Sequence, residues 1–294
     1  MAAVCPLCAL GTMVRRLLSL IKFEHTIFAF PFAIMAAFLA AGGWPSLRQF
    51  GLICGAMVGA RSAAMAFNRI VDRQQDSVNP RTRERELPTG KVTLAQAWAI
   101  VIVGSVVFLG SAALLNRLTA LLSPVALLII LSYSYTKRYT RLTHAVLGLC
   151  LAIAPMGAWI AVRGRLDLAP FFLSAAVILW VAGFDIIYAC QDVEFDRQQR
   201  LFSLPASLGV SRALWIARMG HGVMVGILLL LPLFISLGFI FKAGVGLVAL
   251  LLLYEHSLVS PRDLSRVNAA FFTVNGMVSL LLMAFTLGDI FGGR

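Results

Sequence analysis

The stretch GLICGAMVGARSAAMAFNRIVDRQQD, residues 51–76, is the starting point for interpreting this chain. It begins as an apolar run of the length that crosses a bilayer as a helix, which takes about 20 residues. It ends in an amide and two carboxylates, Asn68, Asp72 and Asp76, each four residues after the one before. Since a step of four residues advances only about 40° around a helix axis, we expect these three side chains to form one polar ridge.

The composition of the whole chain is typical of a membrane protein. Of its 294 residues, 60% are hydrophobic and 13% charged, and the mean hydropathy is +0.88. Soluble domains carry roughly 25% charged residues, so the apolar excess is expected to face lipid. Apolar segments long enough to span a bilayer lie near 24–42, 50–71, 93–113, 119–136, 144–162, 170–191, 213–234, 236–256 and 268–288. We therefore expect an all-α polytopic membrane protein of about nine transmembrane helices, because helices satisfy their own backbone in lipid.

Two regions are expected: a cytoplasmic N-terminal segment, 1–23, and a transmembrane domain, 24–290. The net charge is +12, and the sequence pI is about 10.3. With the N-terminus in the cytoplasm, sixteen Lys and Arg residues fall on the cytoplasmic side and six on the other. This bias follows the positive-inside rule, so we expect a lipid bilayer and no nucleic acid as the partner of these charges. Cys5 and Cys8 have CxxC spacing but no second pair, so no zinc or redox site is expected.

A second acidic segment resembles the first. Each consists of an apolar helix, carboxylates, the letters DRQQ, an LP turn and a new helix, which suggests two related halves. In the second segment Asp185, Tyr188, Asp192 and Asp196 are spaced to share one helix face. Carboxylates in a membrane helix cost several kcal/mol unless they are paired or solvated, so they are functional candidates by default.

The residue types around these acids indicate a particular ligand. Clustered carboxylates need a compensating cation, and Mg²⁺ takes oxygen ligands and is commonly held by one or two carboxylates together with substrate phosphates. Basic side chains that are able to bind a diphosphate lie on the same side of the membrane: Arg81, Arg85, Lys137, Arg138 and Arg141. Acids for Mg²⁺ and bases for phosphate at one end of an apolar bundle predict a site for a lipid diphosphate.

Four motifs give the chain its resemblance to a known family. NRIVDRQQD matches the NxxxDxxxD signature of the UbiA superfamily of membrane aromatic prenyltransferases, and DIIYACQDVEFD resembles its second signature, DxxYxxxDxxxD. NPRTRERELPTGKV resembles the loop after the first signature, and YSYTKRYT resembles the YxxxK segment. The motifs occur in the family's order, and the similarity covers about residues 20–290.

The resemblance implies a reaction. A polyprenyl diphosphate would lose pyrophosphate, and an electron-rich aromatic ring would attack the allylic carbocation. The side chains expected to hold Mg²⁺ on the diphosphate are Asn68, Asp72, Asp76, Asp192 and Asp196. Arg85 and Lys137 would contact the diphosphate, Tyr133 belongs to the same substrate-binding segment, and the isoprenoid tail would leave through a lateral opening into lipid.

The acceptor side of the expected site rests on three residues. Arg61 lies seven residues before Asn68 and shares its helix face, so it is expected either to pair the carboxylate of an aromatic acid or to form a salt bridge with Asp72 or Asp185. Asp185 is expected to be an acceptor-side or supporting residue, and Tyr188 to hydrogen-bond beside it or to pack as a buried aromatic.

One position departs from the family pattern. Many members have Asp directly after the signature Asn, whereas this chain has Arg69, which removes a carboxylate. The resemblance is to the prokaryotic branch grouped with 4-hydroxybenzoate polyprenyltransferases, which act in respiratory quinone synthesis at the inner membrane. Prenylation of a futalosine-route menaquinone precursor, or of another acceptor such as homogentisate, haem, chlorophyllide or a glycerol lipid, stays open. A cation-coupled transporter would distribute its acids across the bilayer, whereas these cluster at one face.

Overall fold

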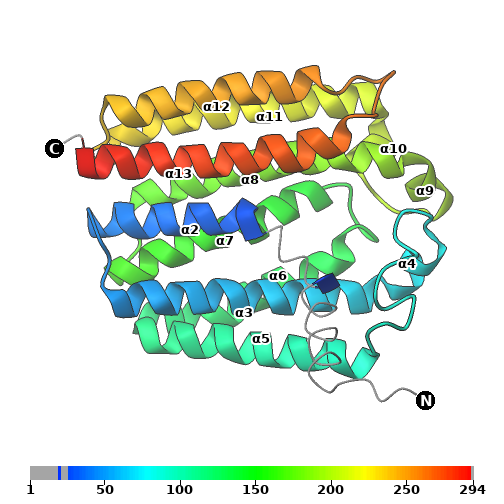
Figure 1. The fold of residues 1–294 in the computed structure, drawn as a ribbon, viewed down its shortest axis with the longest axis horizontal. Coiled ribbons are helices and arrows are strands. Elements are labelled where there is room, and N and C mark those ends of the chain that lie inside the picture. Colours follow the sequence, from blue (N-terminus) through cyan, green and yellow to red (C-terminus); the bar gives the residue numbers. More distant parts are fainter. Residues whose placement is uncertain (1–18, 21–25, 293–294) are drawn as a thin grey trace, which may run out of the picture.

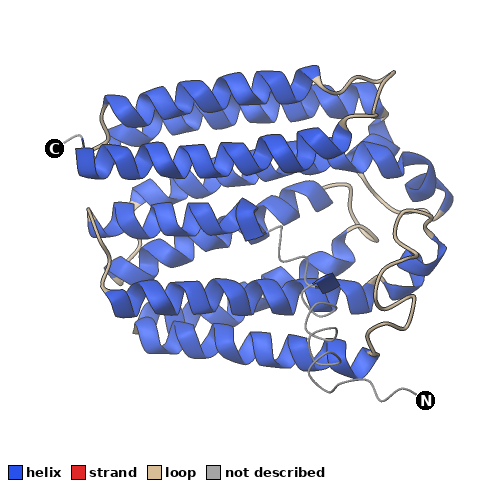
Figure 2. Cartoon of the chain, in the orientation of Figure 1, coloured by secondary structure: helices blue, strands red, loops and turns tan. Residues whose placement is uncertain are grey.

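The computed structural model describes residues 19–20 and 26–292, and in that part of the chain the secondary structure is helical (Figures 1 and 2). Most of the expected N-terminal segment 1–23, with Cys5 and Cys8, lies outside the described residues. The long helices are α2 (Thr26–Ala41), α3 (Leu47–Val71), α5 (Leu94–Leu115), α6 (Arg117–Thr136), α7 (Thr143–Arg163), α8 (Leu168–Ala189), α11 (Val210–Leu230), α12 (Phe239–Ser257) and α13 (Asn275–Gly292). The short ones are α4 (Arg73–Val78), η2 (Cys190–Asp192), α9 (Val193–Gln198), α10 (Leu204–Leu208), η3 (Leu231–Leu233) and the π-helix η4 (Ala269–Val274).

Each of the nine predicted spans corresponds to one long helix. Eight helices within the described residues are long and apolar enough to cross a membrane, and α2 is a shorter apolar helix of 16 residues. Pro124, inside the fourth predicted span, is accommodated within α6. The expected all-α membrane bundle is therefore confirmed.

Local sequence explains where several helices begin. Ser46 before α3 and Thr93 before α5 each accept a hydrogen bond from the backbone three residues on, where a Gln side chain returns to the cap. Asn116 and Thr119 form the same reciprocal arrangement at the start of α6. Such capping boxes satisfy donors that lack a partner in the first turn. At the other end of a helix, α7 stops at Gly164, whose φ of 69° suits glycine.

Small residues bring neighbouring helices close together. A Cβ on Gly59 of α3 would lie 2.7 Å from the backbone of α5, and a Cβ on Gly104 would lie equally close to α3. Gly148 of α7 approaches the backbone of α8 in the same way. Helices in lipid associate through such close packing, since burying apolar surface gains little there.

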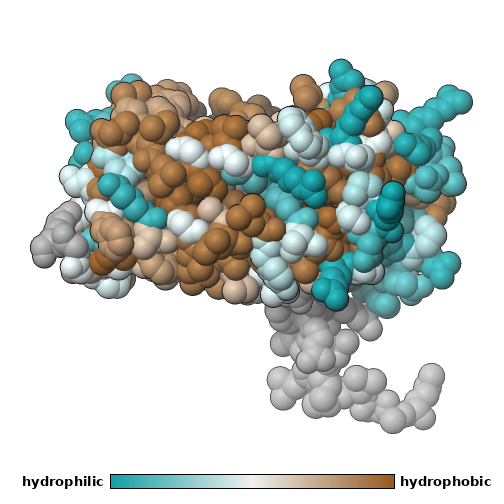
Figure 3. Space-filling model, turned by 90° about the horizontal axis from the view of Figure 1, so that it is seen from above, coloured by the Kyte–Doolittle hydropathy of each residue, from teal (hydrophilic) through white to brown (hydrophobic). Residues whose placement is uncertain are grey.

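Helix α8 is the most buried of the eight helices long enough to cross a membrane, and its Trp180, Val181 and Ile187 have no exposed surface. The short helices α4, α9 and α10 lie at one end of the bundle, away from the C-terminus (Figure 1). We call this the signature end, defined by residues 72–92, 137–142, 190–209 and 258–268. Figure 3 shows hydrophobic side chains along the middle of one face and hydrophilic ones gathered towards the signature end. A cavity of about 840 Å³, lined by residues such as Trp159, Phe171 and Ile235, lies at the opposite end.

Candidate functional site

The first acidic segment bends at Asp72. Helix α3 ends at Val71, and Asp72 (φ −89°, ψ 5°) joins it to the six-residue helix α4. The expected continuous ridge is therefore broken, and Asp76 lies on α4 rather than on the membrane helix. Asn68 still reaches Asp72, donating from Nδ2 to Oδ2 at 2.9 Å. The spacing predicted the cluster, but the turn places its two carboxylates on different elements.

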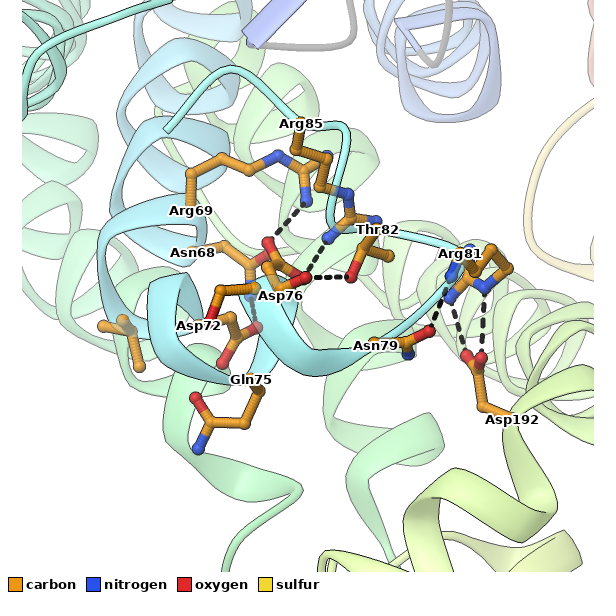
Figure 4. Close-up of polar contacts among 12 residues, drawn as sticks. Asn68, Arg69, Asp72, Gln75, Asp76, Asn79, Arg81, Thr82, Arg85 and Asp192 are labelled. Atoms are coloured by element: carbon orange, nitrogen blue, oxygen red, sulfur yellow. Dashed lines mark hydrogen bonds and ion pairs between the residues drawn. The ribbon is translucent and has the colours of Figure 1, made fainter. Parts of the chain in front are cut away.

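Asp76 is 6% exposed and lies between two guanidinium groups (Figure 4). Arg85 Nη1 lies 2.6 Å from its Oδ1, and Arg69 Nη1 lies 4.0 Å from its Oδ2. Its backbone oxygen accepts a hydrogen bond from the Thr82 hydroxyl at 3.1 Å. Arg69, the residue directly after Asn68, is thus a buried partner of Asp76, an interaction that the sequence did not indicate.

The second acidic segment repeats this geometry. Helix α8 gives way to the short turn η2, and Asp192 (φ −103°, ψ 8°) then caps the six-residue helix α9, which carries Asp196. Asp72 and Asp192 thus occupy equivalent junctions, each between a membrane helix and a short helix. This likeness agrees with the two related segments inferred from the sequence, although here too the continuous helix face that was expected for Asp185, Tyr188, Asp192 and Asp196 is interrupted.

Arg81 connects the two segments. It lies in the loop after the first acidic segment, and its Nε and Nη2 donate to Oδ1 and Oδ2 of Asp192 at 3.0 and 2.6 Å (Figure 4). Its Nη1 donates to the Tyr188 hydroxyl at 2.8 Å, and the guanidinium lies 5.1 Å from the centre of that ring. A two-point contact of this kind fixes direction as well as distance.

The end of α6 contacts both segments. Lys137 Nζ lies 2.7 Å from Oδ1 of Asp196, whose side chain has no exposed surface. The neighbouring Arg138 Nη2 donates to the backbone oxygen of Val71 at 2.7 Å and lies 3.4 Å from Oδ1 of Asp72. Two consecutive residues therefore bind one carboxylate from each acidic segment, which brings the segments together at a single place.

Each of the four carboxylates of the two acidic segments, those of Asp72, Asp76, Asp192 and Asp196, is paired with at least one basic side chain. Burial and the nearby charge of Asp76 raise the pKa of Asp72, and Arg138 offsets this only in part. Burial lowers the pKa of Arg81, but its hydrogen bond and charge interaction with Asp192 outweigh the burial and leave that pKa above its ordinary value. Among the described residues, no three acidic, His or Cys side chains converge as they would around a metal ion.

Asp185 has a partner that the sequence analysis missed. His144, at the start of α7, lies with Nδ1 2.7 Å from Oδ2 of Asp185, and its Nε2 accepts a hydrogen bond from the Leu204 backbone at 3.3 Å. Because Nε2 accepts, the ring hydrogen is on Nδ1 and is donated to Asp185. His144 and Asp185 are 41 residues apart, and no spacing signal pointed to the pair.

Arg61 has no salt bridge of the kind expected. In the described part of the chain it pairs with neither Asp72 nor Asp185, and its Nε is buried without a hydrogen-bond partner. Tyr133 is half-buried on α6, and its hydroxyl makes no hydrogen bond to a described residue. Of the substrate-side residues expected from the sequence, Asp185 and Tyr188 have hydrogen-bond partners, whereas the Arg61 Nε and the Tyr133 hydroxyl have none among the described residues.

Comparison with known proteins gives concordant matches. The profile of the UbiA prenyltransferase family matches residues 29–277. A 4-hydroxybenzoate octaprenyltransferase from Azotobacter vinelandii is 32% identical over 231 residues, which is 78% of each chain. One from Methylobacillus flagellatus is 30% identical and covers 86% of this chain and 85% of its own.

Solved structures match over nearly the whole chain. The apo structure of a UbiA homologue from Aeropyrum pernix K1 has a TM-score of 0.82 and 38% identity, covering 90% of this chain and 98% of its own. A UbiA homologue from Archaeoglobus fulgidus bound to DMAPP and Mg²⁺ has a TM-score of 0.76 at 22% identity, covering 94% and 99%. The second likeness shows the fold alone.

Proposed function

Since this chain belongs to the UbiA prenyltransferase family, we propose that it transfers a polyprenyl group from a polyprenyl diphosphate to an aromatic acid of the 4-hydroxybenzoate type in respiratory quinone synthesis, with Mg²⁺ as cofactor. It is an integral membrane enzyme, and family membership sets aside the transporter hypothesis. The observation that carries the proposal is that the neighbouring residues Lys137 and Arg138 bind Asp196 and Asp72, so that acids and bases from both segments lie side by side at the signature end.

The donor types fit Mg²⁺, while in this structure no three of the acids among the described residues converge on one point. One amide oxygen and four carboxylates are hard ligands of the kind that this ion prefers. In our proposal the residues that hold it are Asn68, Asp72, Asp76, Asp192 and Asp196. When bound, Mg²⁺ would neutralise the charge that develops on the departing diphosphate.

Basic residues would exchange partners when the substrate binds. Arg85 and Lys137 pair with Asp76 and Asp196 in this structure, at 2.6 and 2.7 Å. In the substrate complex we propose that both turn to the diphosphate oxygens, where charge-assisted hydrogen bonds would assist the leaving group. Arg81 and Arg138 lie within the same cluster and would contribute in the same way.

The acceptor is proposed to lie beside Arg61. The buried Nε of Arg61 has no hydrogen-bond partner among the described residues, which is costly in a membrane helix, and the carboxylate of an aromatic acid would satisfy it. Asp185 has one oxygen held by His144, while its Oδ1 makes no hydrogen bond to the described residues and would accept one from the acceptor. Tyr133 and Tyr188 would also line the acceptor site.

The test uses purified protein in detergent with MgCl₂, labelled polyprenyl diphosphates of several lengths, and a panel of 4-hydroxybenzoate, a hydroxynaphthoic acid and homogentisate. We expect Mg²⁺-dependent pyrophosphate release and a prenylated ring with the first acid. A prenylated hydroxynaphthoic acid alone would favour the menaquinone alternative. If none of the acceptors in the panel were prenylated, the proposal would be contradicted.

Matched variants separate the site from the fold. Asp192→Asn should abolish turnover, whereas Asp263→Asn, which alters an exposed turn acid at the same end of the bundle, should leave turnover intact.

The proposed orientation places the signature end in the cytoplasm, and a membrane-impermeant thiol reagent applied to Ser77→Cys in oriented vesicles would test it. Labelling from the outer side of intact cells would contradict that orientation.

A further inference from the structure

A second polar cluster lies inside the bundle, and it is separate from the acidic segments. It is formed by side chains of α8, α11, α12 and α13. Glu255 and Asn275 have no exposed surface, and His221 is 2% exposed. Polar groups buried this deeply in a membrane protein are costly unless their hydrogen bonds are made, so the cluster needs an explanation.

Asn275 is the centre of this cluster. Its Oδ1 accepts a hydrogen bond from Trp180 Nε1 at 2.6 Å. Its Nδ2 donates to Oε1 of Glu255 at 2.7 Å and to the backbone oxygen of Ala270 at 3.0 Å. One amide side chain therefore ties together α8, α12 and the turn that precedes α13.

His221 fixes the other side of the cluster. Its Nε2 donates to the backbone oxygen of Trp180 at 3.0 Å, so Nδ1 is left to accept from His256 Nε2 at 3.1 Å. Gly183 allows this approach, because a Cβ at that position would collide with His221 Nε2. The polar side chains are thus held by specific contacts with the helix that carries Tyr188.

The turn that Asn275 holds is the π-helix η4, which contains Ala270 and Phe271. Single π-turns inside α-helices occur frequently at functional sites. The Phe271 ring stacks on the Tyr188 ring, with centroids 4.1 Å apart and planes at 29°. The Tyr188 hydroxyl in turn receives the hydrogen bond from Arg81, which binds Asp192.

We propose that Asn275, held by Glu255 and Trp180, is a positioning residue: it fixes the π-helix so that Phe271 supports Tyr188 and thereby places Arg81 beside Asp192. The inference rests on the proposed function only for the role of Arg81 in diphosphate binding. The contact path itself is independent of that role, and none of Glu255, Asn275 and Phe271 belongs to an acidic segment.

The first test is hydrogen–deuterium exchange of the substrate-free protein. Asn275→Leu keeps a similar volume and removes the three hydrogen bonds. We expect faster exchange of the backbone amides at residues 81–85, and unchanged exchange in the loop 164–167 at the opposite end. Unchanged exchange at 81–85 would overturn the proposal, whatever the enzyme's substrate.

The second test measures binding of inorganic pyrophosphate with MgCl₂ by calorimetry. Partners that orient metal-binding side chains typically contribute about 10–100-fold in metal affinity or activity, so we take the lower end and expect Asn275→Leu and Phe271→Leu each to weaken binding roughly tenfold. If both substitutions act through the same contact, the double variant should bind pyrophosphate no more weakly than the single variant with the lower affinity. Additive losses would overturn the proposal, and no binding by the unaltered protein would instead contradict the proposed function.

Two further variants separate positioning from general stability. Thr286→Val removes a buried hydroxyl that donates to the Leu282 backbone on the same helix, so it should lower the melting temperature without changing pyrophosphate affinity. Glu255→Gln retains the oxygen that accepts from Asn275 and should keep the affinity within about twofold, because removing charge alone leaves that hydrogen bond in place. If Thr286→Val lost as much pyrophosphate affinity as Asn275→Leu, the effect of Asn275 would be one of general stability, and the positioning proposal would be overturned.

Discussion

The guanidinium of Arg81 spans both carboxylate oxygens of Asp192, although the two residues are 111 positions apart. Arg81 belongs to the loop after the first acidic segment, and Asp192 begins the short helix of the second. The contact makes the two segments one unit, because neither the loop nor the helix end can shift alone without losing a two-point hydrogen bond.

Replacing Arg81 should therefore weaken binding of the donor. We expect Arg81→Gln to raise KM for the polyprenyl diphosphate on the order of tenfold, since hydrogen bonds to charged groups contribute about 1.5–3 kcal/mol. Steady-state kinetics with a labelled donor would measure this. Arg83→Gln is the control, because Arg83 is exposed and pairs only with the exposed Glu84 among the described residues. Equal effects of the two substitutions would contradict a specific role for Arg81.

Asp72→Asn should stabilise the substrate-free protein at neutral pH. The pKa of Asp72 is raised by burial and by Asp76, so the folded state binds a proton here more strongly than the unfolded chain does. The stability that this group contributes is present at low pH and is lost as pH rises through the raised pKa, so the ionised carboxylate opposes folding at pH 7. We expect a higher melting temperature for Asp72→Asn, together with loss of the stabilisation given by Mg²⁺ and pyrophosphate.

Asp263 supplies a control in which the Asp→Asn substitution should change the melting temperature in the opposite direction. Hydrogen bonds from the backbone and side chain of Ser265 lower the pKa of Asp263, so this carboxylate contributes stability above its unfolded pKa and loses it as pH falls through the folded value. Asp263→Asn should thus lower the melting temperature slightly at pH 7. A lower melting temperature for both variants would contradict the electrostatic account of Asp72.

Arg61→Met should change acceptor selectivity rather than donor binding. If the guanidinium pairs the carboxylate of an aromatic acid, KM for 4-hydroxybenzoate should rise on the order of tenfold or more, because a charged hydrogen-bond partner is removed. A phenol without a carboxylate should be used equally well by both enzymes. Product formation from the two acceptors in competition would measure the effect. An unchanged preference for the acid would exclude this role for Arg61.

Gly104→Ala should destabilise the bundle, whereas Gly110→Ala should not. Both glycines lie on α5, but a Cβ at Gly104 would meet the backbone of α3 at 2.7 Å, and one at Gly110 would meet nothing within 4 Å. Overpacking costs typically about 1–3 kcal/mol, while alanine in an open helical position gains up to about 1 kcal/mol over glycine. Thermal unfolding in detergent would compare them. A similar change in melting temperature for both variants would contradict the claim that the close approach of Gly104 to α3 sets its cost.

Much of the fold followed from the sequence because lipid restricts the possibilities. A chain with nine long apolar segments must cross as helices, and the long helices of the structure match those segments. The structure places the acids that the sequence singled out at one end of the bundle, and they could be singled out because carboxylates are rare in so apolar a chain. The bends at Asp72 and Asp192 were not expected, because helical spacing continues through both junctions and does not indicate a break.

By itself, then, the sequence determined the membrane class, the number of long helices and which acids gather at one end of the bundle. The tertiary structure decided which partner each acid has: Arg81 for Asp192, Arg69 and Arg85 for Asp76, and His144 for Asp185. It also decided that Asn275 hydrogen-bonds to the backbone of Ala270, the residue before Phe271. Hydropathy and periodicity are local properties of the chain, whereas these contacts depend on how helices far apart in sequence pack against one another.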